Sequence, residues 1–264
     1  MVNFIKWSLL MVGLLSLTAG CSEPVTSEEF LQSYQVRSGT VVEVLNRNGN
    51  INITGWDEEV IEIKALKESL HGPEALEEVD INIDIAEILT IETVYSAGSN
   101  YVSVDYEIKV PGDLLVGAVE STNGNVTLEN VSGNPLLNTS NGSITAVNVN
   151  GIVTAETSNG NITATGVRSL AGLNTSNGNI TAELPAIHED LVIETSNGSI
   201  SLLLSPALAI TLNVQTSNGQ ITAANLNFDQ SEINQTRLSG LLNGGGYRLA
   251  VLTSNGSVEL APLR

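Results

Sequence analysis

The sequence predicts an all-β protein built as a single-stranded parallel β-helix, a β-solenoid of about 18-residue coils with β-rich segments capping both ends. Three observations predict this fold class. The dipeptide Asn-Gly recurs at spacings that settle on 18 residues, apolar residues alternate with polar ones on both sides of it, and aromatic residues make up only 4% of the chain. A core with so few aromatic residues must consist of Val, Ile, Leu and Ala, which suits flat stacking of strands.

The repeat is defined by the glycine of each Asn-Gly pair. Two places after this glycine and five places before it, every copy has an apolar residue. This alternation predicts strand, turn and strand in each copy, with one face of each strand buried. We expect the pairs to be structural turns, because glycine and often asparagine adopt positive φ at little steric cost. The pairs are Asn48-Gly49, Asn123-Gly124, Asn141-Gly142, Asn159-Gly160, Asn177-Gly178, Asn197-Gly198, Asn218-Gly219 and Asn255-Gly256.

Two architectures use such a unit. Asn-Gly is a strong hairpin signal, so a meander of antiparallel hairpins is one alternative. The solenoid is favoured because stacked coils place equivalent residues over one another, which explains repeated Asn, Thr and Ile at fixed positions. The extra residues of the longer copies, near 185–187 and 206–208, fall in the second bend and leave the Asn-Gly corner intact. We therefore expect Asn141, Asn159 and Asn177 to form one column.

The amino terminus has the features of an export signal. Residues 1–20 are expected to be a lipoprotein signal peptide, whose apolar run after Lys6 is too short to span a bilayer, since a spanning helix needs about 20 apolar residues. The stretch 17–21 resembles a lipobox, and we predict lipid attachment at Cys21, the single cysteine of the chain. Residues 21–36 are polar and acidic, and we expect them to be a tether between lipid and folded body.

The remaining chain is expected to form one continuous domain with two parts. In the β-rich N-terminal part, residues 37–115, alternation predicts strands over 41–45, 51–53, 60–64, 79–85, 89–94 and 101–110, with at most a short helical turn over 72–78. The repeat solenoid with its C-terminal cap spans 116–264, and its last Asn-Gly copy is expected to close the stack. Both flanks act as caps in this scheme, because bare stack ends expose unpaired strand edges.

Charge and composition exclude several classes of function. The formal net charge of −19 opposes binding to nucleic acid, which needs clustered Lys and Arg. His71 and His188 stand in expected loops without partners at metal-ligand spacing, so we expect neither metal nor cofactor. The acidic stretches 57–59 and 77–78 match no calcium-loop pattern and are interpreted as solvated surface.

Paired carboxylates are the one route to catalysis that the repeat offers. Glu156 and Glu194 both stand four places before the glycine of their copy. Polysaccharide-cleaving enzymes need two acids that converge on one face. A row of Glu and Asn on an outer face is more often solvated, so we expect no catalytic residues.

Several phrases together resemble the DUF4097-type β-strand-repeat family and the related adhesin (GIN-like) head domains. They are the stretches 48–53 and 55–57, the sequence Ile-Lys-Val-Pro at 108–111, the Thr-Ser-Asn-Gly repeats, and the closing Gly-Gly-Gly copy, and they cover about residues 38–261. The resemblance implies a β-solenoid-like fold on exported or membrane-anchored proteins, and it brings no catalytic residues.

The function expected from these features is that of a non-enzymatic cell-surface lipoprotein. It would display an adhesin-like or envelope-binding module at the cell surface or in the periplasm, held to the membrane by its lipid and contacting an envelope glycan or protein. The alternatives are a polysaccharide-active β-helix enzyme and a structural or envelope-stress accessory protein.

Overall fold

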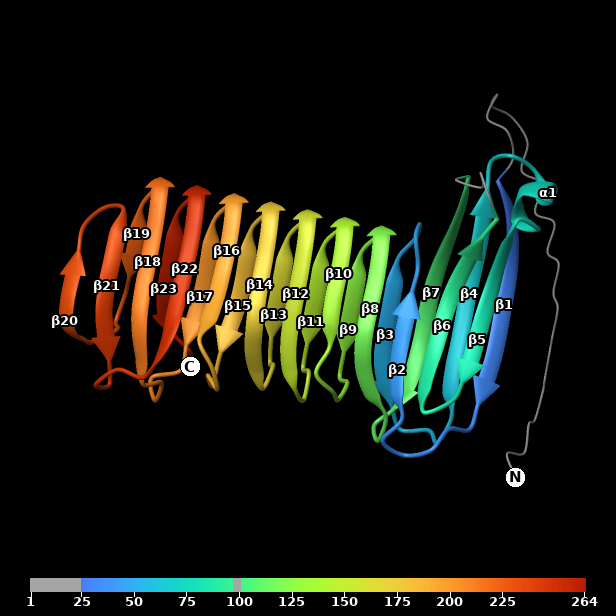
Figure 1. The fold of residues 1–264 in the computed structure, drawn as a ribbon, viewed down its shortest axis with the longest axis horizontal. Helices are drawn as coiled ribbons and strands as arrows, with labels where there is room; N and C mark the ends of the chain where they lie inside the picture. The colour runs from blue at the N-terminus through green and yellow to red at the C-terminus, as the bar shows by residue number, and fades with distance from the viewer. Residues whose placement is uncertain (1–24, 97–100) are drawn as a thin grey trace.

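The structure, a computed structural model, describes residues 25–96 and 101–264. The expected signal peptide and Cys21 lie outside the described residues. In the described part the chain folds into two long β-sheets that face each other and form an elongated flattened stack (Figure 1). Among the described residues, no helix is long and apolar enough to cross a membrane.

The two sheets are defined by their strand order. Sheet A consists of β1 (Thr26–Tyr34), β4 (Ile61–Ser69), β7 (Val102–Pro111), β3 (Ile51–Trp56), β9 (Val126–Glu129), β11 (Ile144–Val147), β13 (Ile162–Thr165), β15 (Ile180–Leu184), β17 (Ile200–Leu204), β23 (Val258–Pro262) and β19 (Ile221–Ala223). Sheet B consists of β20 (Phe228–Ile233), β21 (Arg237–Leu242), β18 (Ile210–Asn218), β22 (Tyr247–Asn255), β16 (Leu191–Asn197), β14 (Ser169–Asn177), β12 (Ile152–Asn159), β10 (Leu136–Asn141), β8 (Leu115–Asn123), β2 (Val41–Leu45), β6 (Ile88–Tyr95) and β5 (Val79–Ile85).

Each regular coil gives one strand to each sheet. The strand of sheet B runs into an Asn-Gly corner, the strand of sheet A follows, and a second bend leads to the next coil. Neighbouring coils are parallel and in register: Asn159 of β12 pairs with Asn141 of β10 and with Asn177 of β14. This confirms the predicted β-solenoid and the predicted column of asparagines, and it excludes the meander of hairpins.

The core lies between the two sheets and is built from the apolar positions of the repeat. The residues two places after each glycine and five places before it are all buried, with exposures from 0% to 8%. Ile144, Ile162 and Ile180 pair in register along sheet A, so like side chains stack on like. Burying an aliphatic side chain of this size stabilises a fold by about 1.5–3 kcal/mol, which makes these rows the main source of stability.

The C-terminal copy does not close the stack, and the prediction that it would do so is wrong. Strands β22 and β23 lie between the coil of β16 and β17 and the coil of β18 and β19 (Figure 1). The far end is formed instead by β18 and β19, with β21 and β20 added antiparallel beyond β18. Every copy presents the same faces, so the repeat pattern leaves the order of copies open. The β20–β21 hairpin, which has no Asn-Gly copy, takes the terminal place.

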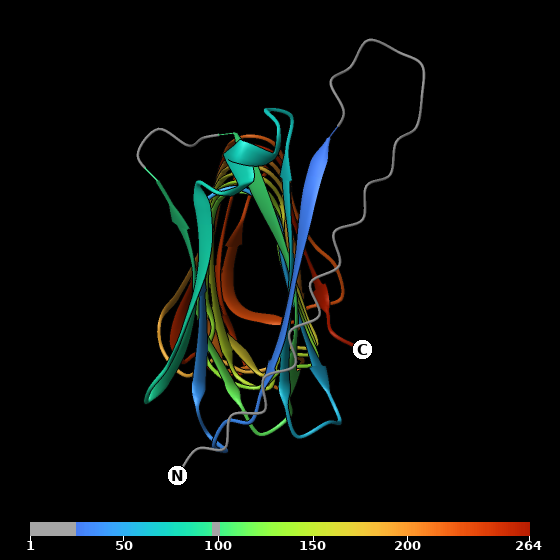
Figure 2. The ribbon, with the colours of Figure 1, turned by 90° about the vertical axis from the view of Figure 1, so that its right-hand side faces the viewer.

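The N-terminal end is closed by antiparallel strands and a short helix. Strands β1, β4 and β7 pair antiparallel in sheet A, and β5 pairs antiparallel with β6 in sheet B. Helix α1 (Pro73–Leu76) follows β4 and buries Ala75 and Leu76. Figure 2 shows this end from outside, with the two sheets facing each other and α1 at their upper edge. The two expected parts of the chain share both sheets, since β2 pairs with β8 and β3 with β9.

The expected tether is too long, because residues 26–34 form strand β1 at the edge of sheet A. This strand pairs with the whole of β4. Phe30 and Tyr34 pack against the core, and Glu28 forms an ion pair with Lys67 at 3.3 Å. Glu28 and Glu29, two of the acidic residues that suggested a solvated linker, therefore face lysines of the neighbouring strand.

Candidate functional site

The Asn-Gly corner carries a continuous ladder of side-chain amides along the upper edge of the stack in Figure 1. Each Nδ2 donates a hydrogen bond to the Oδ1 of the asparagine on the neighbouring coil, at 2.7–3.0 Å. All donors point toward the N-terminal end. In spatial order the ladder runs through Asn48, Asn123, Asn141, Asn159, Asn177, Asn197, Asn255 and Asn218.

The glycine of each pair is required for close stacking, and our explanation by positive φ is wrong for all pairs except Asn48-Gly49. Among these glycines only Gly49 has positive φ, and none of the paired asparagines has it. A Cβ added to Gly160 would lie 1.9 Å from the carbonyl oxygen of Gly142, and the other stacked corners are equally tight. In addition, Thr175 Oγ1 donates to the Gly160 oxygen at 3.0 Å beneath the corner. The corner is thus a structural seam whose side chains form hydrogen bonds between neighbouring coils.

Glu156 and Glu194, the two carboxylates of the enzymatic alternative, stay apart. Both are exposed on sheet B, in a row in which Asn174 of β14 lies between them. Two strand spacings separate them, about 10 Å between Cα atoms. They stand on the sheet surface, and neither lines the grooves described below. The arrangement lacks the enclosed pair of acids that glycoside cleavage needs.

The histidines and acidic stretches also stay separate. The ring of His71 stacks on Tyr101 with centroids 4.1 Å apart, and His188 is exposed in the loop between β15 and β16. In the part of the chain that the structure describes, no group of three or more His, Cys, Asp or Glu side chains is placed to hold a metal ion.

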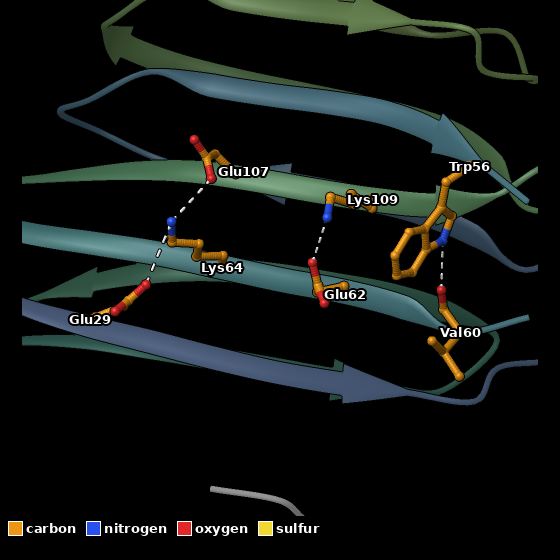
Figure 3. A network of polar contacts seen from close by, with 7 residues as sticks. All are labelled: Glu29, Trp56, Val60, Glu62, Lys64, Glu107 and Lys109. Atoms are coloured by element: carbon orange, nitrogen blue, oxygen red, sulfur yellow. Dashed lines mark hydrogen bonds and ion pairs between the residues drawn. The ribbon is translucent and has the colours of Figure 1, made fainter. Parts of the chain in front are cut away.

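The outer face of sheet A near the N-terminal end carries a network of polar contacts (Figure 3). Lys64 lies between Glu29 at 3.5 Å and Glu107 at 3.3 Å, and its hydrogen bond to Glu107, together with both negative charges, raises the pKa of its ammonium group. Lys109 pairs with Glu62 at 3.0 Å and lies 5.0 Å from the centre of the Trp56 ring. The network ties β1, β4, β7 and β3 together, and its charges are already paired.

A groove of about 550 Å³ lies beside this network and contains the first acidic stretch. Residues 57–59 line it together with Trp56 and Asp113. The indole Nε1 of Trp56 donates to the carbonyl oxygen of Val60 at 2.9 Å, which holds the tight turn between β3 and β4. Among the residues that the structure describes, none forms an ion pair with the acidic groups that line this groove.

The second bend carries another groove, which we call the bend groove, with a volume of about 680 Å³. It lies on the lower edge of the stack in Figure 1, where the loops before β16 and β18 meet the start of β22. It is lined by Pro185, Ala186, Ile187, Asp190, Ala207, Leu208, Ala209, Gly246 and Tyr247. The two coils with extra residues and the intercalated C-terminal copy thus depart from the repeat at the same place.

The walls of the bend groove are mostly apolar, with a few fixed polar groups. Leu208 is buried at 5% exposure, whereas Tyr247 is 51% exposed. Asp190 Oδ1 accepts a hydrogen bond from the Arg248 backbone N–H at 2.8 Å, and Asn243 Nδ2 donates to the carbonyl oxygens of Pro206 and Leu208. Sequence reasoning placed the extra residues in the second bend but missed the groove. It forms only because the last copy inserts next to β16.

Comparison with known proteins gives a family and a set of similar folds. The family model described as Toastrack DUF4097 matches residues 41–261. No curated protein matches the chain.

Three similar solved structures illustrate the folds that match. They are a candidate cell adhesion protein from Clostridium sporogenes (10% identity, 90% of this chain and 100% of that chain covered, TM-score 0.42), a candidate adhesin from Bacteroides fragilis (11%, 89% and 97%, 0.44) and a candidate lipid binding protein from Parabacteroides distasonis (13%, 88% and 96%, 0.42). Likeness at this level carries no information about ligand or activity.

Proposed function

The chain belongs to the Toastrack DUF4097 family, and from this premise we propose that it is a non-enzymatic envelope-binding module, exported and anchored in a membrane through a lipid on Cys21. It displays its β-solenoid at the cell surface or in the periplasm and binds an envelope glycan through the bend groove. The single observation that carries the proposal is this groove, in which three departures from a regular repeat meet.

The solenoid supplies a stiff support for such a site. The asparagine ladder and the in-register core rows fix each coil against its neighbours, so the loops of the bend groove start from rigid strands. Binding sites of this kind, loops held by a rigid scaffold, are common. The volume of about 680 Å³ is in the range of pockets that hold small ligands or a few sugar units.

The chemistry of the groove suits the end of a glycan. The half-exposed ring of Tyr247 offers an aromatic surface for the apolar face of a sugar, and Leu208 lies at the floor. Asp190 uses Oδ1 for the Arg248 N–H, and within the described residues Oδ2 has no hydrogen-bond partner. That oxygen is free to accept a hydrogen bond from a sugar hydroxyl.

The proposal is tested with the folded body lacking residues 1–21, immobilised and incubated with cell-wall glycans and solubilised envelope fractions. We expect retention of a glycan, and we expect Tyr247→Ala to abolish it. Tyr101→Ala is the matched control, because Tyr101 is a similarly exposed tyrosine, at 59%, outside the groove. Equal retention by both variants would exclude the groove as the binding site, and no retention by the native body would contradict glycan binding.

The membrane anchor is tested separately with the full chain. We expect Cys21→Ala to move the protein from the membrane fraction to the soluble envelope fraction. A variant that stays in the membrane fraction would show that the lipid on Cys21 is not the anchor.

A further inference from the structure

We propose that the corner formed by Val25, Leu70 and Tyr101 rests on the lipid surface that anchors the chain and sets the orientation of the solenoid on it. This inference depends on the lipid attachment proposed above. It adds a second contact between protein and membrane, made by the folded body itself.

The corner is a row of three large apolar side chains, each directly beyond the end of one of three neighbouring strands. Thr26 of β1 pairs with Ser69 of β4, and Ser69 pairs with Val102 of β7. Val25, Leu70 and Tyr101 are the residues directly beyond these paired strand ends, and extending the register by one residue brings them next to one another, at the strand spacing of about 4.8 Å. The edge of sheet A therefore ends in an apolar row that is bordered by the ring of His71, which stacks on Tyr101.

These side chains are unusually exposed for their type. Val25 is 58% exposed, Leu70 55% and Tyr101 59%. In the part of the chain that is described, five large apolar side chains are more than half exposed, and three of the five stand in this row. Single exposed apolar residues are common on protein surfaces, whereas a cluster marks an interaction site.

The position of the row along the chain identifies a lipid surface as its partner. Because β1 begins at Thr26, only residues 22–24 separate Cys21 from Val25. At 3.3–3.6 Å per residue even an extended chain keeps Val25 within about 14 Å of the lipidated cysteine. A long tether would have let the body move away from the membrane, but the strand β1 removes that freedom.

Charge near the row indicates an apolar contact rather than an electrostatic one. Lys67 is paired with Glu28, and Lys64 lies between two glutamates, so the lysines of β4 leave no unpaired positive charge for anionic lipids. With a net charge of −19, the protein is repelled by anionic surfaces. The anchor supplies a high local concentration, so a weak apolar contact is enough.

The contact would direct the proposed binding site away from the membrane. The start of β1 and the end of β4, which the row adjoins, lie at the upper edge of the N-terminal end in Figure 1, whereas the loops that line the bend groove lie on the lower edge toward the other end. A solenoid resting on this corner therefore presents the bend groove to the surroundings of the cell.

The test uses the full lipidated chain in phosphatidylcholine vesicles with brominated acyl chains, which quench tryptophan only on contact. Trp7 lies in the expected signal peptide, which is cleaved before Cys21, so Trp56 is the native reporter. Trp56 is the last residue of β3, which places it at the end of sheet A away from the row. We expect Tyr101→Trp to add a fluorescence component that is quenched several-fold more than Trp56. The matched control Ile233→Trp, at an equally exposed position (59%) on β20, should show no added quenching.

Two readouts separate the possible failures. The mass of the N-terminal peptide is measured first, and absence of the lipid would overturn the anchor and this inference together. Lipidated, vesicle-bound protein without quenching at position 101 would overturn the corner contact alone and leave the proposed function intact. Shielding of that position from acrylamide without lipid quenching would show that a second copy covers the corner, which also contradicts the proposal.

Discussion

Replacing Gly160 by alanine is expected to disrupt the seam at the Asn-Gly corner. The new Cβ would lie 1.9 Å from the carbonyl oxygen of Gly142 and 2.4 Å from its carbonyl carbon, both rigid backbone atoms. Real Cβ atoms do not come within 3.0 Å of such atoms, so the two coils must move apart by about 1 Å or more. Hydrogen bonds at 2.9–3.0 Å do not survive such a shift.

The magnitude follows from the bonds at this corner. Across the seam that must open, the Gly142 N–H donates to the Asn159 oxygen at 3.0 Å, Thr157 donates to the Gly142 oxygen at 3.0 Å, and Asn159 donates to Asn141 at 3.0 Å. Each bond contributes about 0.5–1.5 kcal/mol net, so the loss of three predicts a destabilisation of about 2–4 kcal/mol. That is a large share of the 5–15 kcal/mol typical of a folded domain.

The assay is urea unfolding of the soluble body followed by circular dichroism. Gly112→Ala is the matched control, because a Cβ there meets no atom within 4 Å and φ is not positive, and it should change stability by less than about 0.5 kcal/mol. Gly160→Asn separates the two explanations of the glycine. If Gly160 were needed for a positive φ, asparagine could replace it without loss of stability. If it is needed for close stacking, Gly160→Asn destabilises the body as much as Gly160→Ala does. A Gly160→Ala body as stable as the native one would refute the reasoning.

Three further predictions concern the ladder and the core. Asn159→Ala should lower the free energy of unfolding by about 1–3 kcal/mol, because it removes a ladder bond on each side. Asn218→Ala removes one ladder bond and should lower the free energy of unfolding by about half as much. Equal urea midpoints for the two variants would contradict the ladder. Burial raises the pKa of Tyr106 above its usual 10, so the folded state favours the neutral phenol, and the stability gained from burying Tyr106 is complete below pH 10 and is lost as the pH rises above that value. Tyr106→Phe should therefore reduce the loss of stability at alkaline pH in thermal melts, and an unchanged dependence of stability on pH would contradict this prediction. Deamidation of Asn-Gly requires the glycine nitrogen to attack the asparagine side chain, and in the eight ladder pairs the glycine N–H donates to the next coil in all but Asn218-Gly219. Among the eight ladder asparagines, peptide mass mapping after mild alkaline incubation should therefore find Asn218 modified first, and earlier loss of Asn159 would contradict this protection.

The sequence predicted the coil because its information is local. The alternation around each Asn-Gly pair marks which side chains are buried, and identity at equivalent positions indicates stacking in register. Asn141, Asn159 and Asn177 do form one column. The resemblance to the DUF4097-type family over about residues 38–261 is confirmed by the match over 41–261. Lipid attachment at Cys21 remains a prediction.

The features that were missed depend on contacts between distant segments. Strand β1 looked like a solvated linker because the lysines that pair with Glu28 and Glu29 lie on β4, more than thirty residues later. The place of the last copy depends on a choice between equivalent sheet edges, which no single copy encodes. The bend groove follows from that choice and was missed with it. For Gly160 the residue type was recognised but the reason was not, since the close approach exists only between stacked coils.

The most direct test of the in-register stack and its altered order is disulfide cross-linking of sheet B in the body lacking residues 1–21, which contains no native cysteine. Glu194 of β16 pairs with Leu252 of β22, and Gln215 of β18 lies one strand farther. Neighbouring strands are about 4.8 Å apart, within disulfide range, whereas two spacings exceed the limit of about 7 Å. Mild oxidation should cross-link the pair Glu194→Cys with Leu252→Cys and leave Glu194→Cys with Gln215→Cys reduced. The reverse result would show that the copies stack in chain order, and no cross-link in either pair would show that these strands are not stacked in register.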